Sequence, residues 1–436
     1  ARRQYGRGAG DADNGRSQRG NDARADRPRR KDGEGMDAEA TNMPSVADLV
    51  ARTRALVPTL AERAAATEDN RSMLDETLVE LTDAGLFKVM QARRYGGYEM
   101  GLPAMAEITA EIARGSASDA WIVGLCGNQN RFVGCYPAEA QEEVYAKDGD
   151  HLITCLVTGP TTTAERVEGG FRLTGKWPYV SGVDQCNWLL LSAFDGGAEE
   201  GNGANASLTF LVPRDAVAEV IDDWHVMGLR GTGSKTVVLE DVFVPAHRAL
   251  NVWNYDADPP PGATVNPGAM FQGVPRIMIF TTMLVAPALG IAQSAVEAYR
   301  ERLETRSSAL MSGKQSENAV SQIALGRAIE QAAMARDILL GAANDFQRRA
   351  EAGDTFTAED RIAHRLRMAE VMRMCTQVVT DVFMDAGTGA MFDRNPLQRM
   401  FRDMYAIRSH VVIDPNNAAE NRGRLSLGID PKPPFI

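Results

Sequence analysis

The chain has 436 residues, a formal net charge of −11, 44% hydrophobic residues and 24% charged residues. This composition is typical of a globular protein, and the length leaves room for two or three structural units. The acidic balance argues against a protein that binds nucleic acid or an anionic membrane over its whole surface, because both partners carry negative charge. We therefore expect that neither nucleic acid nor another polyanion is the partner.

Cysteine usage and hydrophobicity indicate a cytoplasmic protein. No stretch approaches the roughly 20 uninterrupted apolar residues of a membrane-spanning helix. No apolar segment follows the basic N-terminal residues, as it does in a secretory signal. None of the five cysteines belongs to a CxxC pair, and their odd number leaves one without a disulfide partner. We expect reduced thiols, a cytoplasmic location and no membrane partner.

The first 150 residues divide into a tail and a helical segment. Residues 1–42 are rich in Arg, Asp, Gly and Asn, and they cannot bury enough apolar surface to offset the entropy of ordering. We expect a disordered tail there; a nucleic-acid-binding arm is the functional alternative, against which acidic residues are interspersed among the arginines. A helical period then begins after Ser45, a predicted N-cap, with Gly85 and Gly115 as signals of helix ends. The pattern predicts an N-terminal helical domain over residues 43–150.

The hydrophobic pattern of the remaining sequence changes twice, first to that of strands and then back to that of helices. Short β-branched or apolar runs bounded by Gly, Pro, Asn or Asp predict a central antiparallel β-domain over residues 151–265. Long helical patterns then predict a C-terminal four-helix bundle over residues 266–436, with one face buried against another subunit. Because strands and helices do not alternate, a doubly wound or barrel α/β fold is excluded. The predicted fold class is α+β, mostly α.

Several common kinds of catalytic site find no match in the sequence. The five histidines are far apart and stand outside HxxxH and HExxH frames, so no metal site is expected. There is no GxSxG elbow, P-loop or kinase motif set. The glycine clusters "GLRGTGS" and "AGTGA" lack the strand and helix that frame a dinucleotide site, and we interpret both as turns. A bound organic cofactor is therefore expected to supply the chemistry.

Four motifs in order carry a family resemblance: "LVELTDAGLFKVMQARRYGG", "KWPYVSG", "WHVMGLRGTGSKTVVLEDVFVPAHR" and "RMFRDMYAIRSHVV". Over residues 45–425 the chain resembles the acyl-CoA dehydrogenase superfamily. Within it, the chain is similar to the flavin-dependent monooxygenase branch, the oxygenase components of two-component aromatic hydroxylases that act on 4-hydroxyphenylacetate or on the phenolic ring of degraded steroids. The resemblance implies an acyl-CoA dehydrogenase-like fold and a homotetramer.

The resemblance also implies the reaction and its partners. Reduced flavin and O2 would form a C4a-hydroperoxyflavin that hydroxylates a small aromatic molecule, phenolic or heteroaromatic. A separate NAD(P)H:flavin reductase would supply the reduced flavin. The alternatives are an acyl-CoA dehydrogenase-like or an N- or S-oxygenating flavoenzyme on the same fold, or a non-catalytic helical oligomer.

Residues for the flavin site follow from the same resemblance. Trp177 would pack against the isoalloxazine, and Ser181 would lie beside N5. The alternative interpretation places Trp177 in a β-sandwich core and Ser181 in a turn. Three residues of the "LVTGP" segment would face the ring edge: Leu156, Thr158 and Gly159.

The phosphate end of the flavin is assigned to Arg306. The family usually grips full-length FAD with an Arg-x-x-Phe segment, whereas this chain keeps Arg306 and has Ala309 in place of the phenylalanine. Arg306 could still pair bidentately with a single phosphate. We therefore expect reduced FMN as the cofactor, with FADH2 as the alternative.

The C-terminal motif indicates the branch of the family. Dehydrogenases carry a glutamate base shortly after an Arg-Asp pair, and alignment on Arg402 and Asp403 puts Val411 at that point. The other position that the family uses for the base falls near Phe280, which is no base either. The resemblance instead places His410 over the flavin, where an imidazole could share the proton of a phenol near neutral pH. A lone histidine on a helix is otherwise more often a surface or core residue.

One departure from the family concerns the substrate pocket. A second histidine is frequent on the helix after "AWIVG", and here Gln129 stands at that position. Asn128 and Gln129 can form hydrogen bonds but cannot titrate. We expect them to line the substrate pocket together with His410; the alternative is an ordinary turn between helices.

Overall fold

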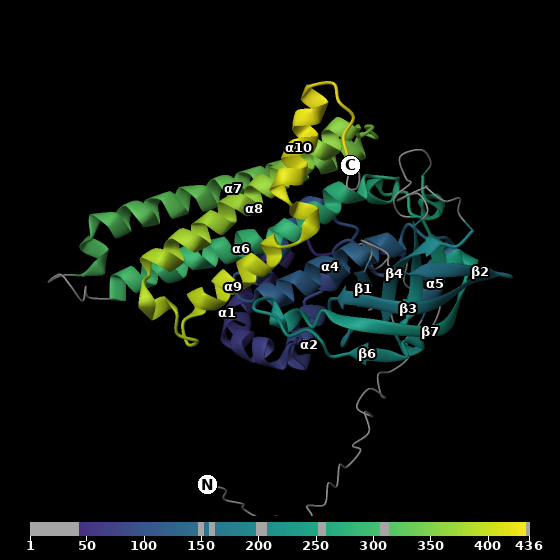
Figure 1. Cartoon of the computed structure of the whole chain (residues 1–436), viewed down its shortest axis with the longest axis horizontal. Coiled ribbons are helices and arrows are strands. Elements are labelled where there is room, and N and C mark those ends of the chain that lie inside the picture. The colour runs from purple at the N-terminus through teal and green to yellow at the C-terminus, as the bar shows by residue number, and fades with distance from the viewer. Residues whose placement is uncertain are drawn as a thin grey trace, which may run out of the picture. The chain divides into compact units, whose positions relative to one another are not determined.

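The computed structural model describes residues 43–146, 152–156, 162–197, 207–251, 259–305 and 314–432. The predicted tail over residues 1–42 lies outside them, as do Thr158, Gly159 and Arg306. From Pro44 onward the chain clusters into one compact unit (Figure 1). Helices, strands and helices follow one another in the predicted order.

The N-terminal helices begin and end where the sequence signals them. α1 (Val46–Asn70) starts with a capping box: the amide of Asp48 donates to Ser45 Oγ at 3.1 Å, and the amide of Ser45 donates to the Asp48 carboxylate at 2.9 Å. α2 (Asp75–Asp83) ends just before Gly85, whose φ of 80° is readily adopted only by glycine. Three further helices complete this segment: α3 (Leu102–Ala113), α4 (Ala117–Val133) and α5 (Ala138–Tyr145).

The strands form one twisted, sandwich-like sheet. Its order is β6-β7-β3-β2-β4-β5-β8, with β1 paired to β4. Most neighbouring strands are antiparallel, as predicted. β1 and β2 are the exceptions, because each runs parallel to β4. β3 reverses the direction of the chain between β2 and β4, so that β2 and β4 run in the same direction. The strands are β1 (Ile153–Leu156), β2 (Thr163–Val167), β3 (Gly170–Val180), β4 (Trp188–Asp195), β5 (Ser207–Pro213), β6 (Glu219–Ile221), β7 (Lys235–Pro245) and β8 (Ala249–Leu250).

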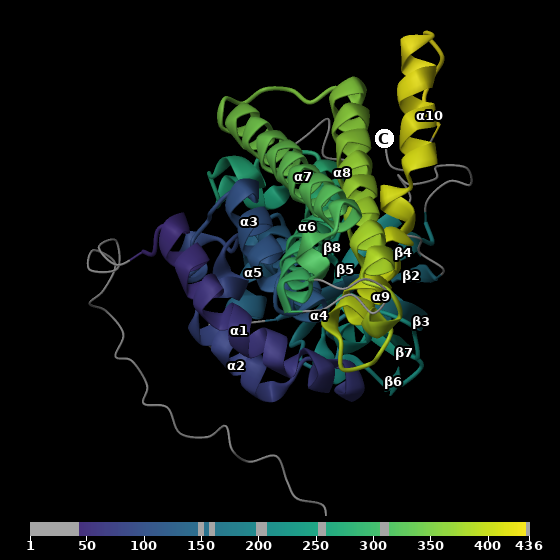
Figure 2. The ribbon, with the colours of Figure 1, turned by 90° about the vertical axis from the view of Figure 1, so that its left-hand side faces the viewer.

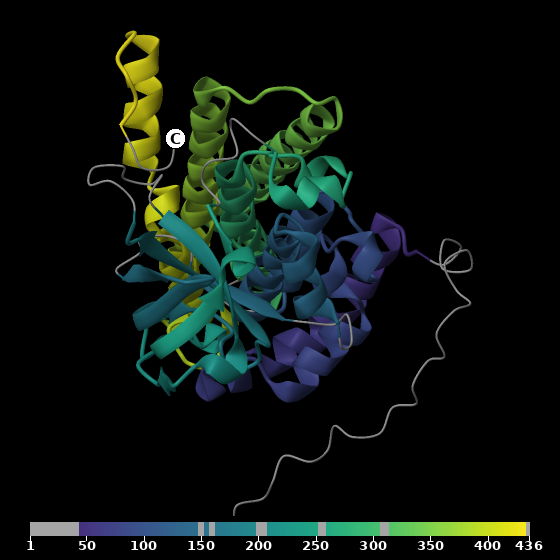
Figure 3. The same ribbon diagram turned by 90° about the vertical axis from the view of Figure 1, so that its right-hand side faces the viewer.

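The C-terminal helices form the predicted four-helix bundle and add a fifth helix. α6 packs against α7, α8 and α9, and α10 lies against α8 (Figures 1 and 2). Seen from the side of the sheet, the strands lie in front of these helices (Figure 3). The helices are α6 (Arg276–Thr305), α7 (Ala319–Glu351), α8 (Ala358–Asp385), α9 (Pro396–Arg408) and α10 (Pro415–Ser426).

α6 is the central element of the helical core. It also packs against α3 and α4, so a single apolar cluster joins the N-terminal and C-terminal helices. By length and composition α6 could span a membrane, but 94% of its most apolar window is buried inside the protein. α6 is therefore a core helix, and a second apolar cluster fills the space between the strands.

We predict that Gly290 is required where α6 crosses α3. A Cβ atom there would lie 2.0 Å from the carbonyl oxygen of Ala110 and 2.7 Å from the Cβ of Ala113. Gly290→Ala must push the two helices apart, which we expect to lower the free energy of unfolding by about 1–3 kcal/mol. Denaturant unfolding measures this change.

The matched control is Gly423→Ala on α10, where an added Cβ meets nothing within 4 Å. That variant should gain about 0.5–1 kcal/mol, because alanine favours a helix over glycine. A Gly290→Ala protein as stable as the parent would contradict the assignment of a tight crossing.

Candidate functional site

A cavity of about 810 Å³ lies between the strands and the helices. α4 contributes Trp121 and Leu125 to its wall, and α6 contributes Phe280 and Leu284. In both helices the two residues are four positions apart, which places them on one face. Another part of the wall comes from the end of α9 and the residues directly after it: Tyr405, Ala406, Ser409, His410 and Val411. The volume and the aromatic walls are those of a site for an organic ligand.

Hydroxyl groups form a connected row on one wall of this cavity. Ser181 follows β3, and its Oγ accepts a hydrogen bond from Trp121 Nε1 at 3.2 Å. The same Oγ lies 2.7 Å from the Oγ of Ser234, which lies 2.7 Å from Oγ1 of Thr232. Thr232 Oγ1 can in turn donate to the carbonyl oxygen of Leu229 at 2.8 Å. Ser181 thus lies in the cavity wall, and its place beside flavin N5 stays a prediction.

His410 also lines the cavity, but it is not part of a helix. It follows α9 and precedes the short 3-10 turn at Val411–Ile413. Its Nδ1 accepts a hydrogen bond from the amide of Val412 at 3.3 Å, so the proton of the neutral ring is on Nε2. Burial lowers the pKa of His410 from 6.5 to about 4, which keeps the ring neutral at pH 7. The ring centroids of Trp121 and Phe280 lie 6.1 and 6.0 Å away.

The structure corrects the interpretation of Trp177 as a wall for the flavin. Its ring is fully buried between the strands, and its Nε1 donates to the carbonyl oxygen of Ser192 at 2.8 Å. The pairing of β3 with β7 shifts register between Trp177 and Val180, and Tyr179 has a φ of 62°. This irregularity presents Pro178 and Tyr179 to the cavity and leaves Trp177 in the sandwich core.

The other predicted flavin contacts are found only in part. Leu156 lines the cavity at the end of β1. Thr158, Gly159 and Arg306 lie outside the described residues. The "GLRGTGSK" segment could border the flavin phosphate or simply form the turn before β7, and in the structure Lys235 Nζ is paired with Asp184 at 2.8 Å.

The two amides predicted for the substrate pocket lie within α4, so the alternative of a turn between helices is wrong. Gln129 reaches the cavity indirectly: its Nε2 donates to the Sγ of Cys155 at 2.9 Å, and Cys155 lines the wall. Asn128 is fully buried, and neither of its amide atoms has a hydrogen-bond partner among the described residues. Buried amides of this kind normally find a partner.

The Arg-Asp pair of the last motif holds one wall of the cavity. The guanidinium of Arg402 donates to the carbonyl oxygen of Met227 at 2.6 Å, and Asp403 Oδ1 accepts from the amide of Leu229 at 2.7 Å. Between them, Gly228 lies so close to α9 that a Cβ would be 2.2 Å from the carbonyl oxygen of Arg402. The loop that carries Met227 and Leu229 is therefore fixed to the helix that precedes His410.

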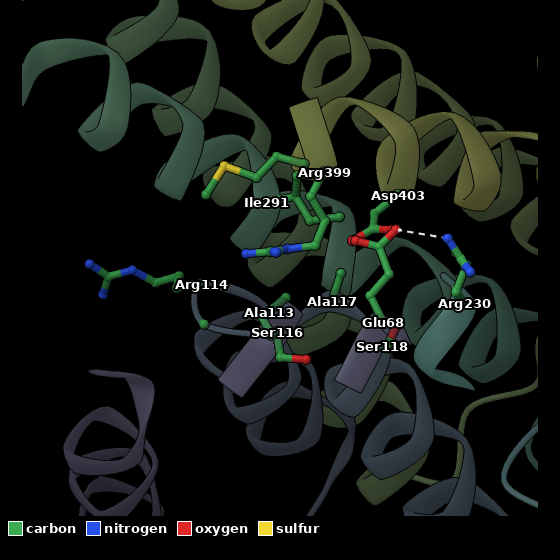
Figure 4. Close-up of a pocket in the computed structure, with 13 residues that line it drawn as sticks. Glu68, Ala113, Arg114, Ser116, Ala117, Ser118, Arg230, Ile291, Arg399 and Asp403 are labelled. Carbon is green, nitrogen blue, oxygen red and sulfur yellow. Dashed lines mark ion pairs between the residues drawn. The ribbon is translucent and has the colours of Figure 1, made fainter. Parts of the chain in front are cut away.

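A second, small pocket lies behind the contact between Asp403 and Leu229 (Figure 4). Its volume is about 30 Å³, which suits a water molecule but not a phosphate or an organic cofactor. The carboxylates of Glu68 and Asp403 face each other in it, and Arg230 Nη1 lies 4.0 Å from Glu68 Oε1. Arg230 is thus paired with an acid of the protein.

The chain is similar to known proteins over most of its length. Residues 282–415 match the family model described as acyl-CoA dehydrogenase, C-terminal domain. The pigment production hydroxylase of Rhodococcus sp. (strain ATCC 21145) is 33% identical over 393 residues, which cover 89% of this chain and 98% of the relative. The flavin-dependent monooxygenase, oxygenase subunit HsaA, of Rhodococcus jostii (strain RHA1) is 31% identical over 87% of this chain and 98% of its own. XiaF from Streptomyces sp., solved in complex with FADH2 and glycerol, has a TM-score of 0.82 at 26% identity and covers 90% of this chain and 98% of XiaF.

We predict that the charge of Asp403 makes stability depend on pH. Burial raises the pKa of this carboxyl from 3.8 to about 6, so the folded protein binds the proton more tightly than the unfolded chain. The ionised carboxylate therefore costs stability progressively as the pH rises through this window. Asp403→Asn keeps an acceptor for Leu229 and should be more stable than the parent by about 1–3 kcal/mol at pH 8, with a much smaller difference at pH 4.

Denaturant unfolding at the two pH values tests this prediction. Asp403→Ala serves as the control, because it leaves the amide of Leu229 without its acceptor and should be less stable than Asp403→Asn at both pH values. A stability difference between Asp403→Asn and the parent that does not change with pH would contradict the raised pKa.

Proposed function

We propose, since this chain belongs to the flavin-dependent monooxygenases of the acyl-CoA dehydrogenase fold, that it is the oxygenase component of a two-component system that hydroxylates a small aromatic molecule. The observation that carries the proposal is the large cavity, in which aromatic walls, a row of hydroxyls and a neutral imidazole lie together. Reduced flavin supplies the electrons that activate O2 when it is bound. A separate NAD(P)H:flavin reductase provides that flavin.

The residues of the cavity fit an isoalloxazine. This ring system is flat, with an apolar benzenoid edge and a polar edge that bears nitrogen and oxygen atoms. Trp121, Phe280 and Pro178 offer the flat and apolar surfaces, and Ser181 offers a hydroxyl. We assign to Ser181 the contact with N5. We assign FMN as the cofactor on the sequence around Arg306, with FADH2 as the alternative.

His410 acts on the substrate as a hydrogen-bond donor in this proposal. Because Nδ1 is engaged by the amide of Val412, Nε2–H is the group that the ring can offer to a phenolic oxygen. A donor at that oxygen stabilises the phenolate that remains after the phenol has released its proton to solvent, and the negative charge of the phenolate makes the ring electron-rich. We assign the polar side of the substrate pocket to Cys155 and to Gln129, which acts through it. Asn128 is assigned to the same side of α4, behind the wall.

Among the described residues that line the cavity, none is a carboxylate that could serve as the dehydrogenase base. Val411, which stands where the sequence alignment puts the dehydrogenase glutamate, lines the wall and cannot accept a proton. We propose that the oxygen atom is transferred to an aromatic carbon. The assay below distinguishes this reaction from oxygenation of nitrogen or sulfur.

We predict that the protein loaded anaerobically with reduced FMN converts phenols to hydroxylated products on mixing with O2, with one oxygen atom derived from 18O2. Mass spectrometry of a panel of phenols, indoles, amines and thioethers measures the incorporation. His410→Phe keeps a ring but loses the donor, and we expect at least a tenfold loss of product with a matching rise in H2O2. His410→Gln restores an N–H donor and should recover part of the product. Since the pKa of His410 is about 4, its protonation should not reduce the rate between pH 8 and pH 5.5.

Two outcomes would overturn the proposal. One is a parent protein that incorporates no 18O with either FMN or FADH2. The other is oxidation of acyl-CoA thioesters in place of aromatic substrates.

We also propose a homotetramer, in which α7 contributes to the contact between subunits. Four apolar residues of α7 are exposed and lie on one face of the helix at spacings of three, eleven and four: Val320, Ile323, Met334 and Ile338. Exposed apolar stripes of this kind mark contacts with another protein surface.

We predict that Ile323→Glu combined with Ile338→Glu dissociates the oligomer, because two carboxylates cannot be buried in an apolar contact without a large cost. Light scattering after gel filtration measures the mass. Ile329→Glu is the control: Ile329 is also exposed on α7, but on the opposite face, and the variant should keep the mass of the parent. A monomeric parent would contradict the proposed contact.

A further inference from the structure

We propose that Ser234 and Thr232 are positioning residues that set the direction of the Ser181 hydroxyl. Through them, Ser181 can either donate a hydrogen bond into the cavity or accept one from it. This inference rests on the proposed function, because it concerns the hydroxyl that we assign to flavin N5. It gives a role to the "GTGS" segment, whose glycines the sequence indicated only as a turn.

The row of hydroxyls has fixed ends of opposite character. At one end, the indole of Trp121 can only donate, and it does so to Ser181 Oγ at 3.2 Å. At the other end, the carbonyl oxygen of Leu229 can only accept, and it lies 2.8 Å from Thr232 Oγ1. Between these ends the three hydroxyl oxygens are separated by 2.7 Å at each step, and all three residues are buried. Each short step requires one proton between its two oxygens.

In two arrangements, the hydroxyls all donate in one direction along the row. In the first, Thr232 donates to Ser234 and Ser234 donates to Ser181. Both acceptor positions of Ser181 are then filled, by Ser234 and Trp121, so its own proton points into the cavity. The carbonyl of Leu229 is still satisfied, because Trp224 Nε1 donates to it at 3.1 Å.

In the second arrangement every hydroxyl turns the other way. Ser181 donates to Ser234, Ser234 donates to Thr232, and Thr232 donates to the carbonyl of Leu229. Ser181 then offers a lone pair to the cavity and no proton. In a third arrangement, Ser181 and Thr232 both donate to Ser234, whose own proton then points into the cavity that Ser234 also lines. Ser181 again offers a lone pair to the cavity, so its own proton points there only when Ser234 donates to it. The hydroxyls change arrangement by rotation about their C–O bonds and without transfer of a proton.

The first two arrangements match the two states of the proposed ligand. The N5 atom of an oxidised flavin is a hydrogen-bond acceptor, whereas N5 of a reduced flavin carries a hydrogen and donates. Ser181 meets the oxidised ring with the first arrangement and the reduced ring with the second. A serine without such a row could not place its proton on a buried partner when N5–H approaches, and a donor would then face a donor.

The local backbone explains why the side chains of Thr232 and Ser234 lie next to each other. Gly233 separates Thr232 from Ser234 and has a φ of 52°, in the left-handed region. This turn places both side chains on the same side, within 2.7 Å of each other. A side chain at position 233 would also meet Asp184 Oδ2 at 3.2 Å and the carbonyl oxygen of Arg71 at 3.0 Å.

The experiment measures the dissociation constants of oxidised FMN and, anaerobically, of reduced FMN. Ser234→Ala removes the acceptor to which Ser181 would donate, so the Ser181 proton can point only into the cavity. We expect reduced FMN to bind at least tenfold more weakly and oxidised FMN to change by less than threefold. The reduction potential of the bound flavin would become about 30 mV more negative for each tenfold change in this ratio. Ser234→Thr restores the hydroxyl and should restore the ratio.

Two further variants distinguish this role from a structural one. In a Ser181→Ala background, Ser234→Ala should change the ratio no further, because the hydroxyl that it directs is absent. Ser192→Ala removes a buried hydroxyl of the same β-domain, 3.0 Å from Thr209 Oγ1, and should leave the ratio unchanged.

An equal loss of affinity for both flavin states in Ser234→Ala, or a ratio equal to that of the parent, would overturn the inference. A further change in the ratio when Ser234→Ala is added to Ser181→Ala would also overturn it. A parent chain that binds neither oxidised nor reduced FMN or FAD would instead overturn the proposed function itself, so the two failures are distinguishable.

Discussion

The buried helix α6 constrains the positions of the elements around it, because it packs against α3 and α4 on one side and against the C-terminal helices on the other. At Gly290 it approaches the backbone of α3 more closely than any residue with a side chain would permit. A contact this close fixes how far α6 can shift along its axis, since packed interiors have little free volume. Phe280 and Leu284 precede Gly290 on the same helix, and they are thereby held in the cavity wall.

The remaining walls are tied to one another through polar contacts. Leu229 is held to α9 by Asp403, and its carbonyl oxygen ends the row of hydroxyls that begins at Ser181. Trp121 connects the two proposed functional groups, because its Nε1 donates to Ser181 while its ring lies next to His410. The hydroxyl and the imidazole come from different parts of the chain, yet both are positioned against one indole on α4. Preorganisation of this kind lets a site act without rearranging during the reaction.

The sequence predicted the fold well because its signals are local and its motifs are specific. The N-cap at Ser45, the glycine at position 85 and the change from helical to strand periodicity each depend on neighbouring residues. The parallel pairs of β1 and β2 with β4 depend on pairing between distant segments, for which periodicity carries no signal.

The site was predicted only in part, because some of its contacts depend on how distant segments pair. His410, Ser181 and Leu156 do line the cavity. Trp177 was assigned to the wrong side of its strand, because a register shift that is invisible in the sequence moves the following residues to the cavity. Ser234 was noticed only as part of the "GLRGTGSK" segment, because its distance from Ser181 is a property of the folded chain.

The charge of the cavity bears on the molecules that it can accept. Among the described residues, none that lines it carries a formal charge at pH 7: burial raises the pKa of Cys155 to about 12, and the pKa of His410 is about 4. The carboxyl of Asp403 contacts the wall only from behind, through the amide of Leu229. A neutral phenol can enter such a cavity without the desolvation cost that a charged molecule would meet. Hydrogen-bond donors and acceptors, instead of ion pairs, then determine its orientation, and this is the task for which neutral hydroxyls, a neutral imidazole and two buried amides are suited.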